Sequence, residues 1–173
     1  MTNFKENLKN VKAFVFDIDG VLSLQTINLN VFGIPKRTVN LRDGYALQLA
    51  VKKGYPIGII SGSNSRDYLK RLKTLGINDI FLNSKIKLEH YKLFKEKFRL
   101  EDSEIMFMGD DIPDLEVMRV AGVPVCPADA DSEIKQAASY ISDKKGGEGC
   151  VRDVVEQVLR LHNKWLDSEA YTW

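Results

Sequence analysis

The stretch AFVFDIDG, at residues 13–20, is the part of the sequence that indicates the fold class most directly. Its first half is a short run that is apolar on both faces, and the run ends at Asp17. Such runs are typical of strands inside a parallel sheet, because helices cover both faces of that kind of sheet. We therefore predict a buried strand over 13–16 and a polar loop directly after it.

Apolar runs at 57–60, 105–108 and 123–126 repeat this pattern, and Pro124 favours an edge or a short strand for the last of them. Amphipathic stretches separate the runs and predict helices over 44–53, 65–75, 87–98, 114–121, 131–138 and about 150–165. This alternation indicates an α/β fold. We expect a doubly wound, mostly parallel, Rossmann-like sheet with helices on both faces.

One segment, at about 25–41, departs from the alternation. β-forming residues flank Gly33-Ile34-Pro35, which predicts a β-hairpin inserted after the first strand. A chain of 173 residues suits one domain of ordinary size. We expect a single domain over 1–173, with a C-terminal tail at about 162–173.

Charge and composition argue against several classes of partner. Lys and Arg number 25 and Asp and Glu number 24, so a net charge of +1 gives no overall field for nucleic acid or a membrane surface. The N-terminal residues lack the apolar core of a signal peptide, and no apolar run is long enough to cross a bilayer. Cys126 and Cys150 have no metal-ligand spacing and are interpreted as reduced thiols. We expect a cytoplasmic protein that binds neither nucleic acid nor membrane.

Polar side chains follow three of the predicted strands: Asp17, Ser61 and Asp110. In an open parallel sheet, ligands bind outside the carboxyl ends of the strands. If these strands are neighbours, the three side chains face one crevice.

The pair Asp17 and Asp19 suits phosphoryl transfer. One carboxylate can attack phosphorus and form an aspartyl-phosphate, while the other protonates the leaving alkoxide and later deprotonates water. Gly20 permits the sharp turn that such a loop needs. The alternative is a turn with solvated carboxylates, but the apolar run before the pair and the Gly-Val-Leu after it favour the catalytic interpretation.

The hydroxyl of Ser61 and the backbone amides from Gly62 onward can hold a phosphate oxygen. A helix N-cap at Ser63 or Ser65 is the alternative, and both roles are compatible. A carboxylate that attacks a dianionic phosphate also needs a cation beside it. Lys85 and Lys87 both precede a predicted helix, and chemistry alone does not choose between them.

The motif Gly109-Asp110-Asp111-Ile112-Pro113-Asp114 suggests a magnesium site, because Mg²⁺ prefers one or two carboxylates with waters and phosphate oxygens. Asp110, Asp17 and the backbone carbonyl of Asp19 could supply the ligands. Asp111 would pair with the lysine or orient a metal-bound water. Asp114 has a second interpretation, capping of the following helix.

Together these motifs resemble the haloacid dehalogenase superfamily of phosphatases, and they occur in that superfamily's order along essentially the whole chain. A closer resemblance is to the family of 3-deoxy-D-manno-octulosonate 8-phosphate phosphatases. It rests on the segments NLRDGY at 40–45, VCPADA at 125–130 and GGEGCVRD at 146–153. A phospho-accepting receiver domain also uses clustered aspartates, but it does not account for the Asp-x-Asp spacing.

The resemblance implies a Mg²⁺-dependent phosphatase of a small phosphorylated sugar acid in lipopolysaccharide sugar synthesis. It places the motif lysine on Lys87 and makes Arg42 and Arg152 face either the substrate or a subunit interface. Gly62, next to Ser61, is also expected to bind the substrate. Ser63 departs from the family, which usually has arginine there. The alternatives are a phosphatase of nonulosonate 9-phosphates and a non-catalytic regulatory binder with the same fold.

The spacing of the motifs leaves no room for a separate cap domain. The resemblance implies a homotetramer in which the hairpins assemble and each site is covered by a neighbour; an exposed hairpin edge favours such pairing. The alternative is a hairpin folded over its own sheet. For the aromatic tail, with Trp165, Tyr171 and Trp173, the alternatives are docking on a neighbouring subunit and simple fraying.

Overall fold

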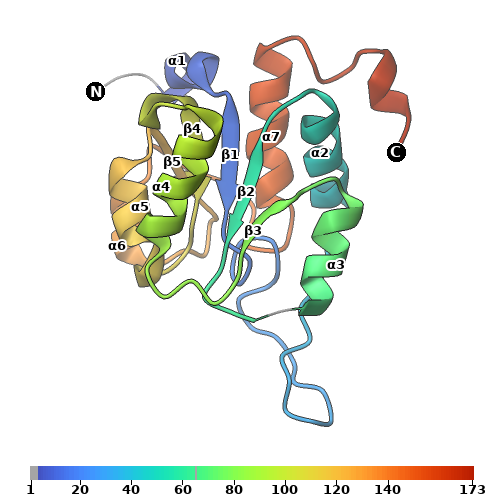
Figure 1. Cartoon of the computed structure of the whole chain (residues 1–173), viewed down its shortest axis with the longest axis vertical. Coiled ribbons are helices and arrows are strands. Elements are labelled where there is room, and N and C mark those ends of the chain that lie inside the picture. Colours follow the sequence, from blue (N-terminus) through green and yellow to red (C-terminus); the bar gives the residue numbers. More distant parts are fainter. Residues whose placement is uncertain (1–3, 65) are drawn as a thin grey trace.

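A parallel sheet lies at the centre of the molecule (Figure 1). The computed structural model describes residues 4–64 and 66–173. Within these ranges six strands pair in the order β3-β2-β1-β4-β5-β6, every pair parallel. Their bounds are β1 Ala13–Phe16, β2 Ile57–Ile60, β3 Asp79–Phe81, β4 Ile105–Met108, β5 Val123–Cys126 and β6 Tyr140–Ile141. The predicted sheet is confirmed, and the edge alternative for β5 is wrong because β6 pairs with its outer side.

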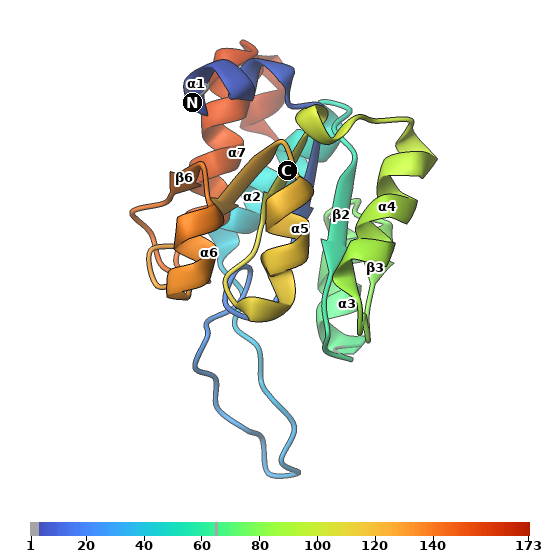
Figure 2. The same ribbon diagram turned by 90° about the vertical axis from the view of Figure 1, so that its left-hand side faces the viewer.

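Helices cover both faces of the sheet, as Figures 1 and 2 show. The α-helices are α1 Phe4–Asn7, α2 Leu41–Lys52, α3 Arg66–Thr74, α4 Lys87–Phe98, α5 Leu115–Val120, α6 Ser132–Ala137 and α7 Cys150–Leu161. The short 3-10 helices are η1 Leu8–Asn10, η2 Asp102–Glu104, η3 Ile112–Asp114 and η4 Ser168–Tyr171. None of the described helices has the length and apolar character needed to cross a membrane.

Alternate residues of β1 enter two separate apolar cores. Phe14 and Phe16 pack with residues of α2, α3 and α7. Ala13 and Val15 pack with residues of α4, α5 and α6 on the other face. All four side chains are fully buried, which explains why this strand is apolar at every position.

The segment after β1 forms a hairpin that projects beyond the carboxyl ends of the strands (Figure 2). Its arms meet in one isolated antiparallel bridge between Leu29 and Pro35, flanked by bonds from Asn30 N to Ile34 O and from Lys36 N to Asn28 O, both 2.8 Å. No regular ladder forms among its described residues. The hairpin stands away from the sheet, so the alternative in which it folds over its own sheet is wrong.

The predicted last helix is too long, since α7 ends at Leu161 rather than near Trp165. Asn163 takes a left-handed conformation with φ of 57°, which turns the chain back. Trp165 is then only 4% exposed, and the hydroxyl of Tyr45 on α2 donates to the carbonyl of Ala170. The tail therefore packs on its own α2, so the fraying alternative is wrong, while docking on a neighbouring subunit stays a prediction.

Candidate active site

The strand register brings the three predicted strand ends to one edge of the sheet. Phe16, the last residue of β1, pairs with Ile59 on one side and with Met108 on the other. The backbone N–H of Asp17 donates to the carbonyl of Met108 at 3.1 Å, which extends the pairing by one step. The side chains that come directly after these strands consequently face a common pocket.

This acidic pocket has a volume of about 610 Å³ and opens at the carboxyl edge of the sheet. Its lining includes Asp17, Asp19, Gln25, Ser61, Gly62, Ser63, Ser84, Lys85, Lys87, Asp110, Asp111, Pro113 and Asp114. The structure thus brings together the acidic, hydroxyl and lysine residues that the sequence proposed for the site.

Lys87 is the cation buried among these carboxylates. As the first residue of α4 it is 6% exposed, and its Nζ lies 2.7 Å from Oδ1 of Asp114 and 3.1 Å from Oδ1 of Asp17. Lys85, the other candidate, is exposed. Of the two lysines, the geometry favours Lys87 as the partner of Asp17.

The carboxylates of Asp17, Asp110 and Asp114 form a set that fits a divalent cation. One oxygen from each lies within 4.8 Å of the others, and all three residues are buried. Oδ1 of Asp110 is buried without a hydrogen-bond partner in the described part of the chain. Mg²⁺ favours such oxygen donors. Sequence reasoning proposed Asp17, Asp110 and the carbonyl of Asp19; Asp114 adds a third carboxylate to the cluster, and the Asp19 carbonyl stays a prediction.

Burial and mutual repulsion shift the pKa values within this set. Burial, followed by the charge of Asp114, raises the pKa of Asp17 well above its usual range, although Lys87 opposes the shift. The same two causes raise the pKa of Asp110 to about 7. Burial acts to lower the pKa of Lys87, but Asp17 and Asp114 outweigh it, so its pKa is raised. The carboxylates thus need a cation beside them to stay ionised.

Asp111 and Asp114 differ from what the sequence suggested. Asp111 is exposed, and its side chain accepts the N–H of Ile112 at the start of η3. The turn of η3 points Asp114 inward, where it contacts Lys87 and accepts the N–H of Asp110 at 3.1 Å. The alternative in which Asp111 pairs with the lysine is wrong, while the alternative in which it orients a metal-bound water stays a prediction. Asp114 makes no side-chain helix cap.

Ser61 lies beside Asp17 at the end of β2. Its hydroxyl is 3.0 Å from that of Ser63 and accepts the Ser63 N–H at 3.2 Å, and the residue is 1% exposed. Gly62, predicted to contact substrate, also lines the acidic pocket. The candidate N-cap at Ser65 lies outside the described residues.

Sequence reasoning missed two contacts from the hairpin. Nε and Nη2 of Arg37 donate to the two carboxylate oxygens of Asp19 at 2.7 and 2.8 Å. Nε2 of Gln25 donates to Oδ2 of Asp110 at 3.3 Å. No motif marks Arg37, because its position depends on the path of the hairpin. Gln25 was likewise not among the predicted site residues.

The loop after β1 is enclosed by a late part of the chain. A Cβ at Gly20 would lie 1.9 Å from Oδ2 of Asp110, and a Cβ at Gly146 would lie 1.9 Å from the carbonyl oxygen of Gly20. The N–H of Gly147 donates to the carbonyl of Val21 at 2.8 Å. Glycine at these positions allows backbone and carboxylate to approach closely.

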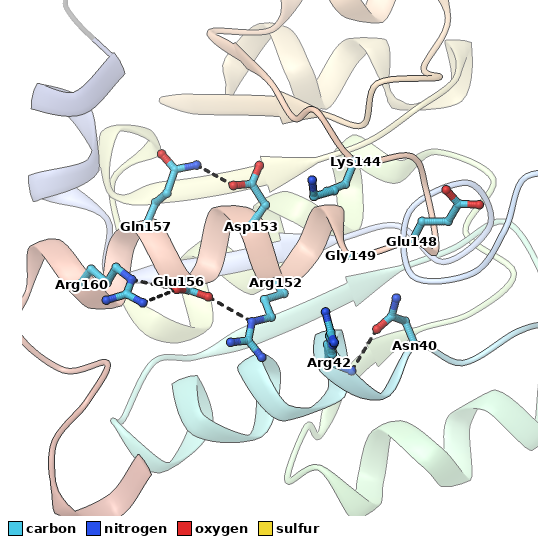
Figure 3. Close-up of a pocket in the computed structure, with 10 residues that line it drawn as sticks. All are labelled: Asn40, Arg42, Lys144, Glu148, Gly149, Arg152, Asp153, Glu156, Gln157 and Arg160. Carbon is cyan, nitrogen blue, oxygen red and sulfur yellow. Dashed lines mark hydrogen bonds and ion pairs between the residues drawn. The ribbon is translucent and has the colours of Figure 1, made fainter. Parts of the chain in front are cut away.

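Arg42 and Arg152 line a different pocket, of about 640 Å³, between α2 and α7 (Figure 3). Arg152 pairs with Glu156 at 3.0 Å, and Arg160 pairs with the same carboxylate group at 2.6 Å. Within one chain neither Arg42 nor Arg152 is among the residues that line the acidic pocket. Their contact with substrate stays a prediction.

Comparison of the sequence with those of known proteins identifies the family to which the chain belongs. The family model described as haloacid dehalogenase-like hydrolase matches residues 26–122, more than half of the chain. The chain belongs to the haloacid dehalogenase-like hydrolases. Among members of that family with assigned activities, the 3-deoxy-D-manno-octulosonate 8-phosphate phosphatase of Salmonella typhi is 30% identical over 163 residues, which cover 94% of this chain and 87% of the relative. That of Escherichia coli K12 is 31% identical over 156 residues, covering 90% and 83%.

Solved structures of haloacid dehalogenase-like hydrolases agree with the fold. The phosphatase of the same name from Moraxella catarrhalis, in complex with magnesium, phosphate and KDO, has a TM-score of 0.89 and 32% identity, with 94% of each chain covered. The Yersinia pestis enzyme has a TM-score of 0.90 and 28% identity, covering 94% of this chain and 88% of that one. The family and these relatives confirm the predicted class of enzyme, a phosphatase.

Proposed function

We propose that the chain is a Mg²⁺-dependent phosphomonoester hydrolase that releases phosphate from 3-deoxy-D-manno-octulosonate 8-phosphate. The observation that carries the chemistry is the burial of Lys87 between Asp17 and Asp114. Beside them lies an oxygen of Asp110 that has no hydrogen-bond partner among the described residues. The relatives with that activity and the magnesium-bound neighbour support the substrate and the metal.

In the proposed reaction, a carboxylate oxygen of Asp17 attacks phosphorus, and the bond between phosphorus and the sugar oxygen breaks. Asp19 gives its proton to the departing alkoxide. Asp19 then takes a proton from the water that attacks the aspartyl-phosphate, which releases phosphate and restores Asp17.

Lys87 and Ser61 hold phosphate oxygens in this mechanism, and the charge of Lys87 also favours the ionised form of Asp17 that attacks phosphorus. Asp17, Asp110 and Asp114 would hold Mg²⁺, together with the backbone carbonyl of Asp19. When bound, the ion supplies positive charge that offsets repulsion between the carboxylates and the phosphate.

Asp17→Asn tests the mechanism, because an amide cannot serve as the nucleophile. Phosphate release from the octulosonate 8-phosphate should fall below detection in this variant, and also in the unaltered chain after chelation of divalent metal. Asp143→Asn, which changes an exposed carboxylate paired with Lys144, serves as the matched control and should keep full activity. Turnover by Asp17→Asn or in metal-free buffer would rule out the mechanism.

The substrate needs a separate test, with nonulosonate 9-phosphates and other sugar phosphates measured beside the octulosonate 8-phosphate. The expected result is the highest kcat/KM for the eight-carbon acid. Preference for a nine-carbon acid would move the assignment to the alternative substrate and leave the chemistry intact. Absence of turnover on every phosphate ester, including an aryl phosphate, would favour the regulatory binder.

We also propose that the enzyme is a cytoplasmic homotetramer. The acidic pocket opens beside the base of a hairpin whose tip exposes Leu29, Val31, Phe32 and Ile34. Exposed apolar side chains grouped on one projecting segment favour burial against another subunit. Such an assembly could bring Arg42 or Arg152 of one subunit toward the pocket of another.

A further inference from the structure

Arg37 donates two parallel hydrogen bonds to the carboxylate of Asp19, 2.7 Å to Oδ1 and 2.8 Å to Oδ2. Paired bonds of this kind fix the plane of a carboxylate as well as its position. The Arg37 side chain is only 11% exposed, whereas that of Asp19 is 37% exposed at the mouth of the acidic pocket. The arginine is therefore the constrained partner, and it limits the motion of an otherwise accessible carboxylate.

A network at the base of the hairpin holds Arg37 in place. The next residue, Thr38, donates its N–H to Oγ of Ser23 at 2.9 Å and accepts the N–H of Leu24 at 3.0 Å through its hydroxyl. Ser23 is fully buried. Since Ser23 comes after the loop that carries Asp19, the arm with Arg37 is tied directly to the backbone that it must reach.

The two hydrogen bonds from Arg37 leave Asp19 able to act on a substrate. Each carboxylate oxygen has two acceptor sites, and Arg37 uses one on each. Among the described residues, no other side chain is hydrogen-bonded to the Asp19 carboxylate. The orientation of this group at the pocket thus depends on the hairpin residue.

We propose that Arg37 is a positioning residue for Asp19: it holds the proton-transferring carboxylate in one orientation at the mouth of the acidic pocket. The catalytic consequence rests on the proposed function, whereas the orientation itself does not. The inference also ties the hairpin to the chemistry of its own subunit, in addition to any role in assembly.

The kinetic test compares Arg37→Met on two phosphate esters. The octulosonate 8-phosphate has an alkoxide leaving group that needs a proton, whereas 4-nitrophenyl phosphate has a leaving group that departs without one. We expect kcat/KM to fall at least about tenfold on the sugar phosphate and much less on the aryl ester. Arg37→Lys should keep a higher kcat/KM on the sugar phosphate than Arg37→Met, because lysine keeps the positive charge but cannot make the two parallel hydrogen bonds. Equal losses on both esters, or no loss on either, would overturn the proposal.

Two further variants separate positioning from charge and test the anchoring of the hairpin. Lys36→Met removes a positive charge from the neighbouring exposed residue and should leave kcat/KM unchanged on both esters. Thr38→Val removes a hydroxyl from the network that holds Arg37 and should give a smaller loss with the same selectivity for the sugar phosphate. If Lys36→Met reproduces the selective loss of Arg37→Met, the role assigned to Arg37 is wrong.

A structural measurement tests the orientation of the Asp19 carboxylate without relying on enzyme activity. Crystal structures of the unaltered chain and of Arg37→Met, grown under the same conditions, should show one Asp19 conformer in the first and a different or multiple conformer in the second. An unchanged Asp19 conformer in the variant would refute the proposal even if the enzyme proved inactive on every ester. Conversely, inactivity of the unaltered chain combined with a displaced Asp19 in the variant would refute the proposed function and support the positioning.

Discussion

Asp43 is a buried carboxylate outside the acidic pocket, at the start of α2. It is 2% exposed, and its Oδ1 accepts the N–H of Arg152 in the first turn of α7 at 2.7 Å. Oδ2 is buried without a hydrogen-bond partner among the described residues. Burial raises the pKa of Asp43 to about 6, although the backbone N–H groups of Arg152 and Gly149 oppose the shift.

This raised pKa predicts a pH-dependent contribution to stability. The unfolded chain releases the Asp43 proton near pH ~4, whereas the folded chain keeps it until about pH 6. Between these values the folded state binds more protons, so the contribution of Asp43 to the free energy of unfolding falls as pH rises. Asn at this position keeps the acceptor for Arg152 and does not titrate.

We expect Asp43→Asn to gain stability relative to the unaltered chain as pH rises from about 4 to about 7, by on the order of 2 kcal/mol. Urea unfolding of both proteins across this range measures the difference. A difference that stays constant with pH would contradict the prediction.

At the residue scale, side chains at strand ends were more predictable from the sequence than side chains carried by loops. Asp17, Ser61 and Asp110 were accessible to prediction because each lies within two residues of the end of a short apolar run, and parallel strands end at one edge. Asp114 was harder to place, since its inward direction depends on the turn of η3. Arg37 could not be placed at all without the path of the hairpin.

At the scale of elements, the C-terminal tail stabilises the outer face of α2. Tyr45 makes edge-on ring contacts with both Trp165 and Trp173. Trp165 is 4% exposed and also lies under the guanidinium of Arg152, 4.9 Å from its ring centre, whereas Trp173 is 67% exposed. The two tryptophans therefore contact the same tyrosine from very different degrees of burial.

Because Trp165 and Trp173 differ so much in burial, their substitutions by alanine form a matched pair. Trp165→Ala should lower the free energy of unfolding by about 3–5 kcal/mol, because it leaves a cavity between α2 and α7. Trp173→Ala should lower it by less than about 1 kcal/mol, as expected for an exposed side chain. Chemical denaturation measures both. Similar losses for the two variants would mean that the tail does not pack as described.

The element predictions succeeded where a helix ended together with its apolar pattern and failed where a local turn intervened. α4 was predicted over its observed range, because its apolar positions recur at helical spacing up to Phe98. The end of α7 was missed, because Trp165 continues the apolar pattern although the chain has already turned at Asn163. Such a residue is buried by the fold of the tail rather than by the helix.

At the scale of the whole molecule, the projecting hairpin carries large apolar side chains that a single chain leaves exposed to solvent. Val31 is 93% exposed and Phe32 is 83% exposed, although both are large and apolar. The sequence could predict the hairpin and its composition, but not the direction in which it projects. That direction depends on the packing at its base, where Thr38 meets Ser23.

If the hairpin assembles with other subunits, Phe32→Asp should dissociate the proposed tetramer by placing a charge in an apolar contact. Light scattering coupled to size-exclusion chromatography would then report a smaller species, with the far-UV circular dichroism unchanged. Leu93→Asp is the matched control, since Leu93 is 54% exposed on α4. It should leave the mass unchanged. A monomeric unaltered chain, or equal dissociation by both variants, would exclude assembly through the hairpin.

The contact of Gly146 and Gly147 with the loop after β1 has a consequence for biosynthesis. Asp17 is translated well before Gly146 and Gly147, yet the loop that carries it packs against the backbone of these two glycines. A ribosome must therefore complete the intervening strands and helices before this contact can form, although domains otherwise begin to fold as they emerge. Premature termination anywhere before Gly146 would consequently yield a product that contains the nucleophile but lacks the support around it.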